Sequence, residues 1–119
     1  MDEIRYGVIG SGMMGIEHML NVHLCEGARV VAIADPNEGS QGWARLTAKE
    51  KGFPLDVFAD HRAMLERGGI DAVVVATPNH THAAVLGAVF ESGLHAMVEK
   101  PLCTTVEDAV RVAARADAH

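Results

Sequence analysis

The sequence predicts an α/β protein built on one doubly wound parallel sheet. Short runs of apolar and β-branched residues alternate with longer stretches in which apolar residues recur at the spacing of a helix. No repeat, low-complexity tract or linker interrupts this alternation, which is typical of successive strand, helix, strand units. The expected strands are Ile4 to Ile9, Arg29 to Ala34, Val57 to Phe58, Ala72 to Ala76 and His95 to Val98.

The helices expected between these strands end near glycines, because glycine readily adopts the left-handed backbone that closes a helix. They run from the first glycine-rich segment to near Gly27, from Ser40 to Lys51, from Asp60 to Gly68, from Asn79 or Thr81 to Gly93, and onward from Thr104. Right-handed crossovers then place the strands in an open sheet with the order 3-2-1-4-5.

The last expected helix begins with a capping box. Thr104 and Glu107 stand three positions apart, the spacing at which each side chain can bond the backbone N–H of the other. In this register Val106, Val110 and Ala113 would face the core.

Composition limits the classes of protein that this chain can belong to. With 119 residues it forms one domain, and its net charge of −6 with scattered basic residues argues against nucleic acid as a partner. No apolar stretch approaches the roughly 18 residues of a membrane span, and the acidic start is no signal peptide. Cys25 and Cys103 have no metal or redox spacing. We therefore expect a cytoplasmic protein with free thiols.

A glycine-rich segment follows the first expected strand at residues 10–15, and Asp35 ends the second strand. Gly10 permits a sharp turn, Gly12 leaves room for a pyrophosphate, and Gly15 lets the next helix lie close to the sheet. The N-terminus of that helix offers unpaired N–H groups to phosphate. This order of elements predicts a Rossmann dinucleotide-binding fold. The contacts expected from this part of the chain are Gly10, Gly12, Met13, Met14, Gly15 and Asp35.

The choice of cofactor follows from charge. Asp35 can accept hydrogen bonds from both ribose hydroxyls of the adenosine half, whereas a 2′-phosphate there would meet a like charge. Neither Pro36 nor Asn37 supplies a compensating positive charge. The sequence therefore favours NAD over NADP.

Two further motifs follow the fourth and fifth expected strands. Thr77-Pro78-Asn79, with His82 close behind, comes after the fourth strand, and Glu99-Lys100-Pro101 comes after the fifth. Because the carboxyl ends of parallel strands line one crevice, we expect both motifs to converge with the glycine turn. His82 would cap the following helix or contact the cofactor.

In this combination of motifs the chain resembles the Gfo/Idh/MocA oxidoreductases, which include glucose-fructose oxidoreductase and inositol dehydrogenase. The resemblance implies that Thr77, Pro78 and Asn79 line the dinucleotide. It places Glu99 and Lys100 beside the nicotinamide, with Lys100 reaching the hydroxyl of a sugar, cyclitol or related polyol. It also implies a carboxy-terminal substrate domain. Residues 1–119 would then be a truncated amino-terminal domain that lacks the sixth strand and the substrate domain.

Lys100 is the expected catalytic residue. Hydride transfer from an alcohol carbon requires a base within hydrogen-bond reach of the oxygen. A cationic oxidised nicotinamide beside Lys100 would favour the neutral amine, and reduction of the ring would favour the ammonium form.

Two alternatives remain open. A non-catalytic NAD-sensing regulatory module would keep the fold without the chemistry, and an adenosylmethionine-dependent methyltransferase has a similar turn and ribose acid. Gly15 and the segment Glu99-Lys100-Pro101 argue against the methyltransferase. The histidine spacings predict no metal site, and His18 is expected at the surface. The free edge of the fifth strand could pair with a second copy in a homo-oligomer.

Overall fold

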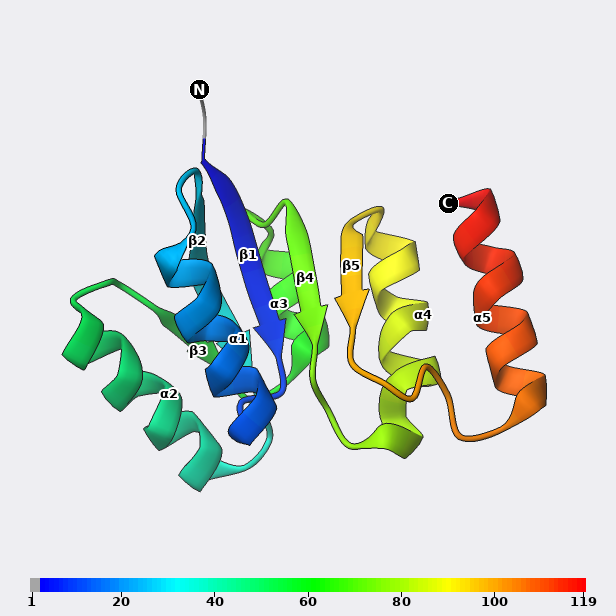
Figure 1. Cartoon of the computed structure of the whole chain (residues 1–119), viewed down its shortest axis with the longest axis horizontal. Coiled ribbons are helices and arrows are strands. Elements are labelled where there is room, and N and C mark those ends of the chain that lie inside the picture. Colours follow the sequence, from blue (N-terminus) through cyan, green and yellow to red (C-terminus); the bar gives the residue numbers. More distant parts are fainter. Residues whose placement is uncertain (1–2) are drawn as a thin grey trace.

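The computed structural model describes residues 3–119 and contains one five-stranded sheet. Every neighbouring pair of strands is parallel, and the strand order is β3-β2-β1-β4-β5, which confirms the predicted order (Figure 1). The strands are β1 (Ile4–Ile9), β2 (Ala28–Ala34), β3 (Asp56–Phe58), β4 (Ala72–Val75) and β5 (His95–Val98).

Helices cover both faces of the sheet, as a doubly wound fold requires. They are α1 (Met13–Leu24), α2 (Glu38–Lys51), α3 (His61–Arg67), α4 (His82–Ser92) and α5 (Val106–Ala118), with a short 3-10 turn, η1 (Asn79–Thr81), before α4. None of the helices formed by residues 3–119 has the length and apolar character needed to cross a bilayer.

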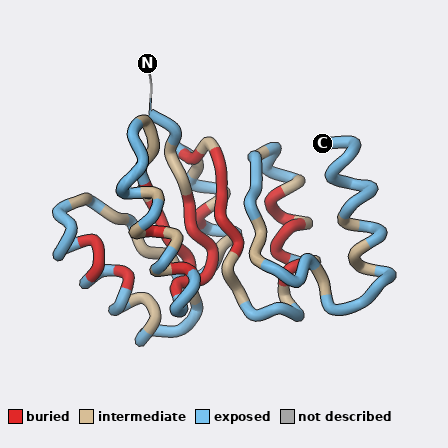
Figure 2. The backbone as a smooth tube through the Cα atoms, viewed as in Figure 1, coloured by how far each residue is buried: buried red, intermediate tan, exposed pale blue. Residues whose placement is uncertain are grey.

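Two apolar cores lie against the sheet, one on each face. Successive residues of a strand point to opposite faces, so Val73 packs with α3 and α4 while Val74 packs with α1 and α2. All four residues of β4 are buried. Figure 2 shows this burial concentrated in the central strands and in α4. The sheet is thus rigidly held at its centre, where the glycine-rich turn begins.

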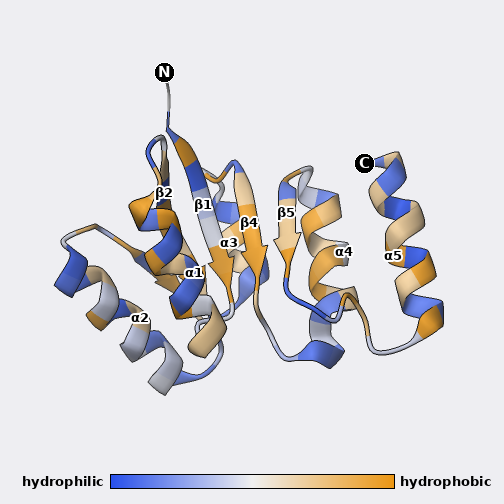
Figure 3. Ribbon diagram, in the orientation of Figure 1, coloured by the Kyte–Doolittle hydropathy of each residue, from blue (hydrophilic) through white to orange (hydrophobic). Residues whose placement is uncertain are grey.

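The outer end of the sheet is much more exposed. In β5 the first three residues are exposed, and α5 has no buried residue. Val106 and Val110 were expected to face the core, but their exposed fractions are 82% and 64%. Figure 3 shows α5 with hydrophobic residues beyond α4, which is the neighbour it contacts. Ala113 is exposed as well, so the expectation that these three residues face the core was wrong.

The cap of α5 also differs from the prediction by one residue. Thr105 has an extended backbone immediately before the helix, and its hydroxyl accepts a hydrogen bond of 3.1 Å from the N–H of Asp108. The pairs Thr104 with Glu107 and Thr105 with Asp108 have the same spacing of three, so the sequence pattern did not distinguish them. The backbone conformation selects the second pair.

An ion pair joins the amino ends of the two central strands, β1 and β4, at the opposite end of the strands from the glycine turn. The guanidinium and backbone N–H of Arg5, at the start of β1, donate to the carboxylate of Asp71, just before β4, at 2.8 to 3.1 Å. These hydrogen bonds lower the pKa of Asp71 from 3.8 to about 2.

Candidate functional site

The turn between β1 and α1 depends on three glycines. Gly10 has φ of +95°, and a Cβ there would lie 2.5 Å from the carbonyl oxygen of Ala76. A Cβ at Gly15 would overlap the carbonyl oxygen of Gly10. At Gly12 the space is open, and no side chain caps the N-terminus of α1. The first two glycines therefore permit the close packing, while Gly12 leaves the helix N-terminus accessible to an anion.

Asp35 connects this turn to the end of β2. One carboxylate oxygen accepts a hydrogen bond of 2.9 Å from the N–H of Ser11, and the other accepts 2.8 Å from the N–H of Asn37. Ser11 is buried, and its hydroxyl donates to the carbonyl of Ser40 at 3.0 Å. Each carboxylate oxygen keeps a further lone pair, so Asp35 is held in place and can still accept hydrogen bonds from a ligand.

A pocket of about 490 Å³ opens between the glycine turn and the ends of β2 and β4. Its lining contains one ionisable side chain among the described residues, Asp35. The lining includes six of the predicted site residues together with four that the motifs did not indicate. The lining residues are Gly10, Gly12, Met14, Asp35, Pro36, Asn37, Ser40, Ala76, Thr77 and Pro78.

Other predicted site residues do not line this pocket. Gly15 is buried beneath the turn, and the side chain of Met13 is 87% exposed. Asn79 and Lys100 are exposed as well. Ser11 and Ser40, whose roles the sequence did not indicate, could have been suspected because they flank the glycines and follow the Asn37 cap of α2.

The loop after β4 is held by hydroxyl contacts. The hydroxyl oxygen of Thr81 lies 2.6 Å from that of Thr77 and 2.7 Å from the carbonyl oxygen of Pro78. These contacts fold Thr77 and Pro78 into a tight turn at the edge of the pocket.

His82 has a different position from the one expected. Its side chain is fully buried, with Nδ1 2.7 Å from the carbonyl oxygen of Pro101 and Nε2 3.0 Å from that of Thr77. A buried ring with both nitrogens engaged by backbone does not reach a ligand in the pocket. His82 instead joins the loops that follow β4 and β5.

Glu99 turns toward α1. Its N–H donates to the carbonyl of Val75 at 2.9 Å, and its carboxylate lies 2.6 Å from Nε2 of His18. The hydrogen bond from His18 lowers the pKa of Glu99. His18 was expected at the surface, but 16% of its side chain is exposed, so that expectation was wrong. Lys100, the next residue, remains exposed.

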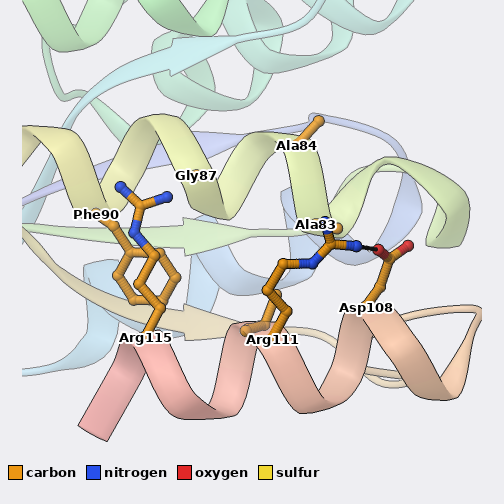
Figure 4. A pocket seen from close by; sticks show the side chains of 8 residues that line it. Ala83, Ala84, Gly87, Phe90, Asp108, Arg111 and Arg115 are labelled. Carbon is orange, nitrogen blue, oxygen red and sulfur yellow. Dashed lines mark hydrogen bonds and ion pairs between the residues drawn. The ribbon is translucent and has the colours of Figure 1, made fainter. Parts of the chain in front are cut away.

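A second hollow, of about 300 Å³, lies between α4 and α5 and contains none of the predicted site residues. Figure 4 shows Arg111 paired with Asp108, and Arg115 lying over the ring of Phe90. Elsewhere in residues 3–119, no group of three or more histidine, cysteine or acidic side chains is arranged to hold a metal ion.

The arrangement of glycine turn, carboxylate and pocket defines a dinucleotide-binding domain. Over residues 4–119 the chain matches the model of an oxidoreductase family with an NAD-binding Rossmann fold, Gfo/Idh/MocA. The chain therefore belongs to this family, and its cofactor is NAD.

The relatives that this chain matches are three to four times as long as the chain. Inositol 2-dehydrogenase 1 from Saccharopolyspora erythraea is 41% identical over 112 residues, which cover 93% of this chain and 32% of that protein. A glycosyl hydrolase family 109 protein from a Shewanella species is 34% identical over 113 residues, covering 91% and 25%. The chain thus spans about one third or less of the relatives it matches.

A solved structure shares the fold closely. The crystal structure of myo-inositol dehydrogenase from Lactobacillus casei in complex with NAD(H) and myo-inositol superposes with a TM-score of 0.88 at 29% identity. The match covers 98% of this chain and 34% of that one.

Proposed function

We propose that this chain is the NAD-binding domain of a longer oxidoreductase, which transfers a hydride between NAD and the hydroxyl-bearing carbon of a sugar, cyclitol or related polyol. The observation that carries the proposal is the open glycine turn beside a carboxylate fixed by two backbone N–H groups. Inositol dehydrogenases among the relatives support a cyclitol or related polyol as the substrate class.

The pocket suggests how the dinucleotide lies. The pyrophosphate would occupy the N-terminus of α1, and the adenosine ribose would face Asp35 on β2. The nicotinamide half of the dinucleotide would then extend past β4 toward β5. The residues proposed to contact it, directly or as parts of these turns, are Gly10, Gly12, Met13, Met14, Gly15, Asp35, Thr77, Pro78, Asn79, Glu99 and Lys100.

Lys100 is the residue to which we assign proton transfer. It follows Glu99 at the end of β5, and its exposed amine is free to meet a substrate delivered by another domain. In the longer protein, Lys100→Met should collapse turnover with polyols and leave the affinity for NAD nearly unchanged. Unchanged turnover would refute this role, and absence of turnover in the unaltered protein would favour the NAD-sensing module.

Calorimetric titration of the chain tests the proposed cofactor preference. NAD⁺ should bind more tightly than NADP⁺, because a 2′-phosphate would face the Asp35 carboxylate. Asp35→Asn should weaken NAD⁺ binding about tenfold, the scale of a hydrogen bond to a charged group, and narrow the difference between the two cofactors. Tighter binding of NADP⁺ by the unaltered chain would contradict the assignment.

We also propose that the protein is cytoplasmic. Cys25 and Cys103 are free thiols, which supports this location.

The edge strand β5 supports pairing with a second copy of the chain. Light scattering that shows a strict monomer at high concentration would contradict the pairing.

A further inference from the structure

A polar contact joins α1 to the end of β5, two segments far apart in the sequence. Nε2 of His18, in the second turn of α1, lies 2.6 Å from Oε1 of Glu99, which is 81 positions later. Both side chains are mostly shielded, with 16% and 25% exposed.

The contact lies on the side of the glycine turn opposite Asp35. In the sheet order, β2 and β5 flank the central strands β1 and β4, so Asp35 and Glu99 end strands on either side of the turn. If the adenosine half of the dinucleotide occupies the β2 side, the nicotinamide half lies toward β4 and β5. Glu99 is therefore positioned at the nicotinamide end.

We propose that His18 is a positioning residue, which holds the Glu99 carboxylate against α1 so that Glu99 and Lys100 flank the nicotinamide of the bound dinucleotide. This inference rests on the proposed function. Oxidised nicotinamide is a cation, and a fixed carboxylate attracts it more strongly than a carboxylate free to turn into solvent. The hydrogen bond from His18 therefore favours the nicotinamide half and has no effect on the adenosine half.

The test compares two ligands that differ in the nicotinamide. ADP-ribose carries the adenosine, pyrophosphate and second ribose, whereas NAD⁺ adds the cationic ring. By calorimetry, His18→Ala should weaken NAD⁺ binding about tenfold, the scale of a lost hydrogen bond to a charged group, and leave ADP-ribose binding nearly unchanged. Glu99→Gln, which removes the negative charge, should show the same selectivity.

Two further variants separate positioning from a general structural effect. His18→Gln retains a side-chain N–H donor near the position of Nε2 and should restore most of the NAD⁺ affinity. His23→Ala removes an exposed histidine five residues further along α1, which stacks on Phe53, and the binding of both ligands should be unaffected.

The outcomes distinguish the inference from the proposed function. If the unaltered chain binds both ligands and His18→Ala weakens both equally or neither, the proposed function stands and the positioning role is wrong. If the unaltered chain binds neither NAD⁺ nor ADP-ribose, both are wrong. Failure of His18→Gln to restore NAD⁺ affinity would also overturn the positioning role.

Discussion

The two sides of the glycine turn are held in place by different kinds of contact. On the β2 side, Asp35 accepts from Asn37 two residues away and from Ser11 across 24 positions, and the side chain of Gln41 donates to the carbonyl of Asp35 at 2.7 Å. On the β5 side, His18 meets Glu99 across 81 positions, and His82 meets Pro101 across 19. Two of the three contacts on the β2 side are local, whereas both contacts on the β5 side join segments far apart in the sequence.

This difference extends to burial. The residues that lead into Asp35 are the buried end of β2, whereas β5 is largely exposed before Glu99. Apolar packing therefore secures the strand that leads into Asp35, while the position of Glu99 depends more on its polar contact with His18. A single polar substitution should accordingly disturb the β5 side more than the β2 side.

A substitution that disrupts the glycine turn should have the largest effect, because the β2 side and the β5 side of the site both adjoin this turn. Gly15→Ala would force a methyl group into the carbonyl of Gly10, and we expect a loss of about 3 kcal/mol or more in the free energy of unfolding. NAD binding should be lost as well. Urea denaturation and calorimetry measure the two effects.

Gly42→Ala is the matched control. Gly42 lies inside α2, and beyond its own helix backbone nothing lies within 4 Å of a new methyl group, so alanine should stabilise the chain by up to about 1 kcal/mol. Destabilisation of similar size in both variants would show that close packing at the turn is not the cause.

His82→Leu isolates the β5 side. Loss of the buried ring would remove its contacts with the carbonyl oxygens of Thr77 and Pro101, at a cost of about 2 to 4 kcal/mol in unfolding free energy. His80→Leu, at an exposed position two residues earlier, should change it by less than about 0.5 kcal/mol. Equal values in urea denaturation would contradict the role assigned to His82.

The start of α5 offers a smaller effect on the same side. Thr105→Ala should cost about 1 kcal/mol because it removes the hydroxyl that accepts from Asp108, whereas Thr104→Ala should be nearly neutral. Thermal denaturation of the two variants compares them directly. A larger loss of stability for Thr104→Ala than for Thr105→Ala would instead support the capping box of Thr104 and Glu107 predicted from the sequence.

Lowering the pH tests the Arg5–Asp71 ion pair, which joins the start of β1 to the start of β4. The pKa of Asp71 is lowered in the folded chain from 3.8 to about 2. The ionised carboxylate therefore stabilises the folded chain above the unfolded pKa, and this stabilisation is lost as the pH falls toward 2. The effect should be small because Arg5 and Asp71 are both partly exposed. Unfolding free energies at pH 5 and pH 3 should fall less in Asp71→Asn than in the unaltered chain.

Prediction from sequence succeeded where the signal is local. The glycine turn, Asp35 and the strand order follow from spacing and apolar periodicity, and the structure has the same sheet. His18 was missed because a lone histidine on a helix has no local sign of a partner 81 positions away. The inward valines of α5 were expected from an amphipathic pattern, yet no element of the described chain covers them.

The doubly wound sheet and the open glycine turn with an acid beside it were determined by the amino-acid sequence alone. Those features depend on backbone freedom and on apolar periodicity within short segments. Tertiary structure alone decided that His82 would be buried between two loops and that His18 would hold Glu99. Such pairings arise when the sheet brings distant segments to one edge, and neither partner carries a local mark of the other.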